Sequence, residues 1–184
     1  ADSWYQDPEE GGWRIISEGC HFVDLIRFIS GSPVERVTAE MIGGGVRGRQ
    51  NDNCIATLRM VDGSIASLVY VANGDPAFDK ERIEVFGQGR SAVIENFHRA
   101  ILYGGKGRPR KIAGHGKGHA EEMAAFIRAV RSGGPSPLPF DEAVATTLVT
   151  FAIAESMQTQ QPIRMDEFEA AAFAEASGQA SVAS

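Results

Sequence analysis

The sequence predicts an α+β fold in which a mostly antiparallel, open-faced β-sheet carries helices packed on one face. One apolar helix-like segment opens the chain, strand-like segments follow, and helix-like segments return after residue 118. This order lacks the alternation of strand and helix that is typical of parallel sheets. Asp62-Gly63 also lies between two strand-like segments, and this dipeptide is a strong signal for a hairpin turn.

The first predicted helix spans about residues 14–30 and ends at Gly31-Ser32-Pro33. Strands are then predicted from their β-branched and apolar residues. Their ranges are 34–42, 54–61, 64–72, 82–86 and 91–95, with weaker strands at 100–103 and 110–112.

The second half of the chain is predicted to be helical. Residues 118–131 form a helix that ends before Gly133-Gly134-Pro135, and residues 141–160 form a long one that Pro162 closes. Residues 166–177 are expected to form a short Ala-rich helix, with a frayed tail at 178–184. We therefore expect one domain over residues 1–165 and a C-terminal helix and tail over 166–184.

The predicted strand at 64–72 has no clearly polar face. Its alternate residues are Ser, Ala, Leu, Tyr and Ala on one side and Ile, Ser, Val and Val on the other. Helices can cover one face of such a sheet, and the other would expose apolar side chains, which usually mark an interface. The pattern predicts a homo-oligomer that packs through the open sheet face.

Composition places the chain among cytoplasmic globular proteins. Hydrophobic residues make up 43% and charged residues 23%, which is ordinary for this class. The net charge of -6 argues against nucleic acid and anionic membranes as partners. No apolar segment reaches transmembrane length, no signal segment is recognisable, and Cys20 and Cys54 lack metal-type spacing.

The best candidate site lies in the first predicted helix. Glu18, His21 and Asp24 recur every three residues, which would place them along one side of a helix that is otherwise apolar. Ionisable groups on a buried helix are costly unless they face a cavity or find partners. The alternatives are a core histidine bonded to a backbone carbonyl and an Asp24 that pairs with Arg14 or Arg27.

Three other motifs are weaker. Residues 43–48 (GGGVRG) fit the letters of a dinucleotide fingerprint, but another strand and not a helix follows, so a hairpin loop is the better interpretation. His115 and His119 have metal-type spacing, yet glycines lie between them and no third ligand is evident, so we expect no metal site. The basic segment 106–111 fits a charged turn or edge strand better than an anion site.

Three segments resemble the C-terminal domain of the Gfo/Idh/MocA oxidoreductases. They are GGWRIISEGCHFVDLIRFISG at 11–31, DGSI to ANGD and KERIEVFG within 62–87, and PFDEAVATT at 139–147 leading to QPI at 161–163. The resemblance covers about residues 3–165. It is strongest to the bi-domain members, in which a region like zinc alcohol dehydrogenase precedes this module, and several of those serve polysaccharide biosynthesis.

The resemblance implies an NAD(P)-dependent dehydrogenase of carbohydrate metabolism, acting on a sugar, polyol or nucleotide sugar. His21 matches the family's catalytic histidine, which works with a lysine of the nucleotide-binding half. Ser17 stands where the family often has a substrate-binding Asp, and Glu18 replaces that acid one place later. We assign catalysis to His21 and Glu18, and substrate binding to Ser17, Asp24, Asn73 and Lys80. For Asn73 a turn role, and for Lys80 a surface charge, are equal alternatives.

No Rossmann unit is present in these residues, so we expect NAD or NADP to be bound mainly by a domain that the chain lacks. We assign no cofactor-binding or metal-binding residue. The chain is expected to be the C-terminal, substrate-binding and dimerising fragment of a longer oxidoreductase, inactive alone. The alternative is a non-catalytic module that uses the same sheet to bind a ligand or a protein.

Overall fold

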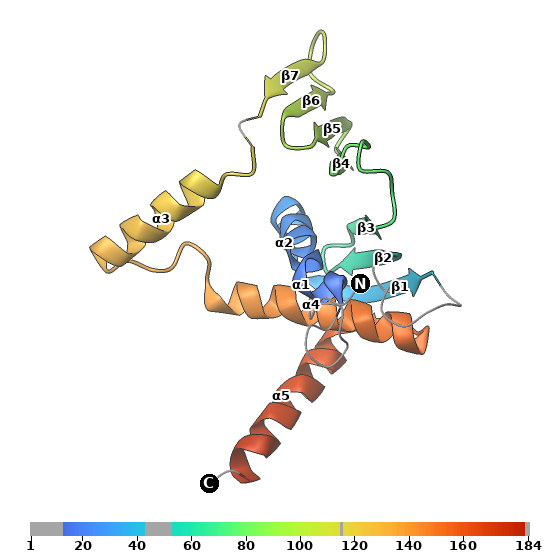
Figure 1. Cartoon of the computed structure of the whole chain (residues 1–184), viewed down its shortest axis with the longest axis vertical. Helices are drawn as coiled ribbons and strands as arrows, with labels where there is room; N and C mark the ends of the chain where they lie inside the picture. Colours follow the sequence, from blue (N-terminus) through green and yellow to red (C-terminus); the bar gives the residue numbers. More distant parts are fainter. Residues whose placement is uncertain (1–12, 43–52, 115, 183–184) are drawn as a thin grey trace. The chain divides into compact units, whose positions relative to one another are not determined.

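The computed structural model describes residues 13–42, 53–114 and 116–182, and side chains as far as residue 178 (Figure 1). The chain divides into two compact units. The first contains residues 1–73 and 138–184, and the second contains residues 74–137. Each unit has a four-stranded antiparallel sheet of its own.

The sheet of the first unit has the strand order β3-β2-β1-β8. Its strands are β1 (Val34–Met41), β2 (Asn53–Met60), β3 (Ile65–Val71) and β8 (Ile163–Arg164). The predicted hairpin joins β2 to β3, where the Met60 N–H donates to the Ser64 carbonyl at 2.8 Å. Asp62 stabilises this turn because its carboxylate accepts from the Ser64 N–H at 2.9 Å, and Gly63 adopts a φ of 90° that favours glycine.

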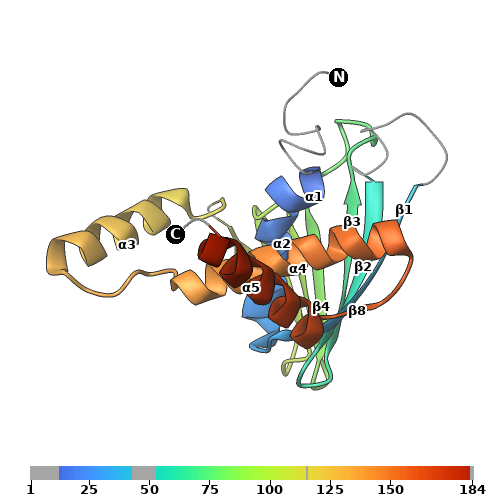
Figure 2. The ribbon, with the colours of Figure 1, turned by 90° about the horizontal axis from the view of Figure 1, so that it is seen from below.

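Helices cover one face of this sheet. They are α1 (Arg14–Ser17), α2 (Gly19–Ser30), α4 (Phe140–Thr159) and α5 (Met165–Val182). Figure 2 shows α4 and α5 crossing the sheet on the same side, and α4 contacts β1 while α2 contacts β3. The core forms between these layers from alternate strand residues and the inner side of α4. Its fully buried members include Ile15, Val23, Val37, Leu58, Met60 and Ile153.

Buried polar side chains link the helices to their neighbours. The Ser156 hydroxyl of α4 accepts from the Ala39 N–H of β1 at 2.9 Å and donates to the Gln161 carbonyl at 2.7 Å. The Arg27 guanidinium of α2 contacts α4, binding the Glu142 carboxylate at 2.6 Å and the Thr146 hydroxyl at 2.7 Å. These bonds satisfy groups that would otherwise be buried at a cost, and they fix how α4 lies on β1 and α2.

The opposite face of the sheet is exposed. Ile55 of β2 faces Val69 of β3, the next pair on this face is polar, with Thr57 opposite Ser67, and Arg59 lies opposite Ile65 after it. Ile55, Ile65, Val69 and Val71 expose between 53% and 71% of their surface. The face is therefore a mixture of apolar and polar side chains, with its apolar members concentrated on β2 and β3.

The second unit is smaller. Its sheet has the order β4-β5-β6-β7, with β4 (Arg82–Gly87), β5 (Arg90–Glu95), β6 (Arg99–Tyr103) and β7 (Arg110–Ala113). Helix α3 (His119–Ser132) follows β7. The basic segment 106–111 forms the turn before β7 and the start of that edge strand, and all its residues are exposed, as the charged-edge interpretation predicts.

The predicted α+β class with antiparallel strands is confirmed, and four details differ. The first helix breaks at Glu18, and the strands form two sheets instead of one. The short strand β8 was not predicted, because two residues give no periodic signal. Helix α5 continues past Ser177 to Val182, where a frayed tail was expected. The domain boundaries at residues 165 and 166 stay a prediction.

We predict that Ser156→Ala lowers the free energy of unfolding by about 1–3 kcal/mol, because it leaves the buried Ala39 N–H and Gln161 carbonyl without a partner. Urea unfolding of the 184-residue chain, followed by circular dichroism, measures the change. Thr147→Ala is the matched control, since this exposed hydroxyl of α4 binds only a carbonyl of its own helix. Equal losses in the two variants would contradict the role of Ser156.

Candidate active site

The candidate site is built around the break between α1 and α2. Glu18 has φ −121° and ψ −29°, so the backbone leaves the helical path for one residue. Gly19 lies directly against Ile15, and a Cβ at Gly19 would come within 2.7 Å of the Ile15 Cδ1 atom. A side chain at Gly19 would therefore require the Ile15 side chain to shift. The His21 N–H then donates to the Glu18 carbonyl at 3.2 Å and starts the second helix.

The break turns the Glu18 carboxylate toward the sheet. The Tyr70 hydroxyl of β3 donates to its Oε2 atom at 2.6 Å. The Tyr70 ring also meets Phe22 of α2 edge to face, with 6.3 Å between the ring centroids. Burial raises the pKa of Tyr70 well above its usual value, and the hydrogen bond and charge of Glu18 raise it further, while the Arg14 charge opposes them. The Tyr70 side chain is thus neutral, and its hydroxyl donates a hydrogen bond to the Glu18 carboxylate.

Ser17, His21 and Asp24 are exposed on the outer side of α1 and α2. The expected buried row of Glu18, His21 and Asp24 is therefore corrected, because the break sends Glu18 inward and leaves the other two facing solvent. Their exposure also excludes the alternative of a core histidine. Arg27 is bound to Glu142, so it is not the partner of Asp24 that the sequence allowed. Among the described residues, the His21 imidazole makes no hydrogen bond.

Asn73 and Lys80 fall in different units. Asn73 is exposed at the end of the first unit, three residues after Tyr70. Lys80 is exposed in the second unit, two residues before β4. The structure therefore describes no common site for them, and their roles stay predictions.

Two aromatic residues of the site were missed by sequence reasoning. Tyr70 shares the inner face of β3 with Leu68, but neither face of this strand is clearly polar in the sequence, so its inward position was not predicted, and nothing linked it to Glu18. Trp13 packs against the core, adopts a φ of 77° that is unusual for a large residue, and buries its Nε1 atom without a hydrogen bond among the described residues. Backbone strain of this kind has no sequence signal.

The other motifs add no site within the part of the chain that the structure describes. Residues 43–48 and His115 lie outside the described residues, and His119 begins α3 as an exposed residue. The described part of the chain contains no cluster of His, Cys, Asp or Glu that could hold a metal ion. Cys20 is partly buried and Cys54 is buried, and no disulfide joins them. No helix in the described ranges is long and apolar enough to cross a membrane.

A family comparison decides the relationship of the chain. Residues 1–93 match the GFO/IDH/MocA C-terminal domain, and this match contains the helix break, Glu18, His21 and Tyr70. The chain belongs to this family. Its sequence has no match among curated proteins.

Solved structures share the fold. An oxidoreductase from Thermotoga maritima is 23% identical, with a TM-score of 0.72 over 87% of this chain and 49% of its own. A UDP-N-acetylglucosamine 3-dehydrogenase from Acidithiobacillus ferrooxidans is 17% identical, with a TM-score of 0.65 over 76% and 45%. Levoglucosan dehydrogenase in complex with NADH is 17% identical, with a TM-score of 0.76 over 89% and 53%. The chain thus spans about half the length of these proteins.

We predict that ionisation of Tyr70 lowers the free energy of unfolding at alkaline pH. A folded-state pKa raised above the unfolded value of 10.0 means that its contribution is complete below pH 10 and is lost as the pH rises further. Tyr70→Phe should cost about 1–3 kcal/mol at neutral pH, because Glu18 loses its donor, and should flatten the alkaline decline.

Urea unfolding from about pH 7 to about pH 11 tests this, across the range in which phenols ionise. Tyr103→Phe is the control, since Tyr103 is more exposed and belongs to the second unit. It should keep the alkaline decline of the wild type. A decline that is unchanged in Tyr70→Phe would exclude a raised Tyr70 pKa.

Proposed function

We propose that this chain is the substrate-binding half of an NAD(P)-dependent oxidoreductase that acts on a sugar, polyol or nucleotide sugar. The observation that carries this is an exposed histidine beside the helix break, in a domain of the GFO/IDH/MocA family. Two solved structures of the same fold are named as dehydrogenases of sugar-type compounds, and one of them contains NADH. Both support the substrate and cofactor classes.

His21 is the proposed proton acceptor or donor at the substrate hydroxyl. Its imidazole is free of other hydrogen bonds among the described residues, and the unperturbed pKa of histidine lies near neutrality. The Glu18 carboxylate accepts from the Tyr70 hydroxyl, and the Glu18 carbonyl accepts from the His21 N–H at the start of α2. We therefore describe Glu18 as a positioning residue for the helix that carries His21.

Ser17 and Asp24 are the proposed substrate contacts, since both lie exposed on the same side as His21. A serine can donate and accept, and an aspartate accepts strongly, which suits the hydroxyl groups of a polyol. Asn73 and Lys80 remain weaker candidates for the same role.

The nicotinamide cofactor, when bound, supplies the hydride chemistry of the reaction. Strand β7 leads into α3 through a glycine-rich turn, but Gly114, Gly116 and Gly118 lack the G-x-G-x-x-G spacing that holds a pyrophosphate, and β7 is an edge strand of an antiparallel sheet. These residues therefore do not fit a dinucleotide. We propose that NAD or NADP is held by a separate nucleotide-binding domain. This chain alone is then inactive.

The second candidate function is a non-catalytic binding module that uses the same fold. Ser17 in place of the family's acid favours it, because a missing carboxylate weakens substrate positioning. The engagement of Glu18 by Tyr70 also suits a purely structural carboxylate. The exposed His21 argues for the enzyme.

We also propose that two copies associate through the open face of the first sheet. The apolar side chains of β2 and β3 on that face are more than half exposed. Exposed apolar patches of this kind commonly form interfaces, and the polar pairs beside them would complete hydrogen bonds across it.

We predict that His21→Ala in the assembled enzyme lowers kcat by about 10²–10⁴-fold, as expected for loss of general acid–base catalysis. NADH affinity should not change, because the cofactor is held elsewhere. Stopped-flow turnover and fluorescence titration with NADH measure the two effects. His98→Ala, a change to an exposed histidine in the turn between β5 and β6, is the control. Turnover near that of the wild type would exclude His21 as the acid–base group, whereas a wild-type protein without turnover would favour the binding module.

We predict that Val69→Glu shifts the chain from oligomer to monomer, because it places a charge at the centre of the apolar patch. Light scattering after size-exclusion chromatography measures the mass. Gln158→Glu adds the same charge to an exposed position of α4 and should leave the mass unchanged. A wild-type chain that is already monomeric at high concentration would end this proposal.

A further inference from the structure

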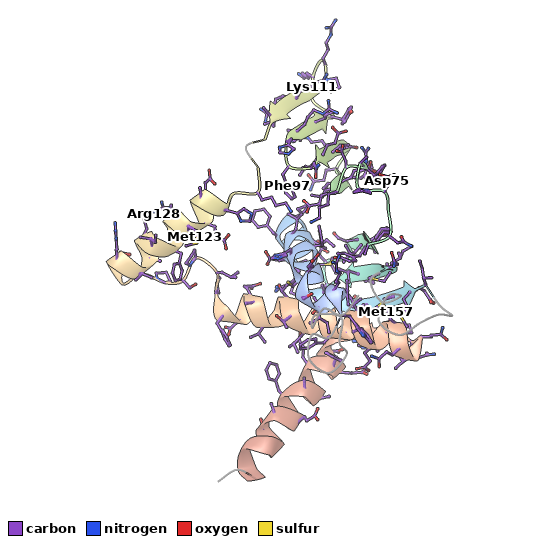
Figure 3. The ribbon with its side chains drawn as sticks, viewed as in Figure 1. Asp75, Phe97, Lys111, Met123, Arg128 and Met157 are labelled. Atoms are coloured by element: carbon purple, nitrogen blue, oxygen red, sulfur yellow. The ribbon has the colours of Figure 1, made fainter. Side chains whose placement is uncertain are left out.

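One side of α2 carries both the proposed acid–base group and an aromatic ring. His21, Asp24 and Phe28 recur at i, i+3 and i+7, which places them on the same side of a regular helix. The opposite side faces the first unit, where Val23 joins the same apolar core as Met157 of α4, which Figure 3 labels. Within the first unit, the side of α2 that carries His21 is therefore the outer one.

Phe28 is the most exposed large apolar side chain among the described residues, at 83%. A single exposed apolar side chain is common on protein surfaces and needs no explanation by itself. Phe28 differs from Phe173 of α5, another exposed ring, because it shares its side of the helix with His21 and Asp24. An apolar ring beside a small number of polar groups is the usual composition of a small-molecule site.

We propose that Phe28 holds a second ring of the substrate, next to the hydroxylated ring that reacts at His21. This role rests on the proposed function, in which His21 exchanges a proton with a substrate hydroxyl. The carbon-bound hydrogens of a sugar ring form an apolar face, which can pack on an aromatic ring while the hydroxyl groups at its edge bind polar side chains. Asp24 lies between the two residues along the helix, where its carboxylate can accept from such hydroxyl groups.

The spacing along α2 fits a substrate of two linked rings. Phe28 follows His21 by seven positions, and the helical rise of about 1.5 Å per residue makes this about 10 Å. Opposite carbons of a six-membered ring are only about 3 Å apart, since each bond is about 1.5 Å long. One ring with its hydroxyl groups is therefore too short to contact both side chains, whereas two linked rings reach from one to the other.

The charge on this side of α2 favours a neutral link between the two rings. The Asp24 carboxylate lies between His21 and Phe28 along the helix, and like charges held side by side are unfavourable. The one lysine or arginine of α2 is Arg27, and its guanidinium binds the Glu142 carboxylate of α4. A diphosphate, as in a nucleotide sugar, would therefore meet a carboxylate on α2 without a cation from the same helix to compensate it.

The substrate class is thereby narrower than the sugar, polyol or nucleotide sugar of the proposed function. It is a glycoside with an uncharged linkage, of which a disaccharide is the simplest case. His21 acts on a hydroxyl group of one ring, and Asp24 binds hydroxyl groups near the linkage. Phe28 packs on the face of the other ring and sets the preference for two rings over one.

Steady-state kinetics of the protein translated from the complete coding region, with NAD and NADP, test this role of Phe28. The probes are D-glucose, cellobiose and UDP-glucose, which share a glucosyl ring, and the matching set of D-galactose, lactose and UDP-galactose. In the set that turns over, kcat/KM should be about tenfold or more higher for the disaccharide than for the other two compounds. Phe28→Ala should raise KM for the disaccharide about tenfold with little change in kcat, and should leave both values for the monosaccharide unchanged.

Three further variants serve as controls. Phe28→Trp should retain the preference for the disaccharide, because it keeps an aromatic face. Phe173→Ala removes an exposed ring from α5 and should change none of the kinetic values. Phe28→Ala should also leave the urea midpoint of unfolding unchanged, whereas Val23→Ala, in the core side of the same helix, should lower it.

Equal losses for monosaccharide and disaccharide in Phe28→Ala would overturn the proposal, as would a preference for the nucleotide sugars. A urea midpoint lowered as far as in Val23→Ala would overturn it too, because Phe28 would then be packed against protein. Saturation-transfer NMR with the two disaccharides measures binding on the same samples without turnover. Binding that depends on Phe28, without turnover, removes only the oxidoreductase function. Turnover without an effect of Phe28 removes only the present proposal, and the absence of both turnover and binding removes both.

Discussion

The hydrogen bond from Tyr70 to Glu18 is the interaction on which the candidate site depends. It holds the one residue that interrupts the first helix, and it links that residue to the sheet. Without an acceptor at Glu18, the partly buried Tyr70 hydroxyl would lose the hydrogen bond that it donates. The Glu18 side chain would then no longer be held toward the sheet. Because Glu18 points to the sheet, Ser17, His21 and Asp24 are left to solvent. The hydrogen bond between Tyr70 and Glu18 thus decides which polar side chains of α1 and α2 face solvent.

The helix that carries His21 is held at both ends by polar contacts of this kind. Glu18 attaches its start to β3, and Arg27 attaches its last turn to α4 through Glu142 and Thr146. Ser156 in turn fixes α4 on β1. The apolar core supplies most of the stability of the first unit, since burial of apolar surface is the main driving force of folding. These few polar bonds fix the positions of α2 and α4 relative to each other and to the sheet, which an apolar core alone specifies poorly.

The sequence predicted the parts of this structure that depend on periodicity. The strand-like residues 64–72 predicted β3, and Asp62-Gly63 predicted its hairpin, but with no clearly polar face the inner position of Tyr70 was not predicted. It did not predict the break at Glu18, because the apolar pattern continues through it and only the packing of Gly19 on Ile15 reveals it. The hydrogen bond between Glu18 and Tyr70 could not be predicted either, because 52 positions separate the two residues in the sequence. Helix α3 was predicted from its apolar spacing and from Gly133-Gly134-Pro135 after it.

The close contact at Gly19 has a consequence for protein engineering. No side chain occupies Gly19, between Ser17 and His21, and a Cβ there would come within 2.7 Å of the Ile15 Cδ1 atom, so Ile15 would have to shift. The local geometry is therefore not that of a straight helix with a serine and a histidine one turn apart. A serine and a histidine placed at the same spacing on an ideal helix of another protein would reproduce the sequence of Ser17 and His21. Their relative positions in space would differ. A transplanted segment therefore also needs Gly19 and the core residues that surround the buried Ile15.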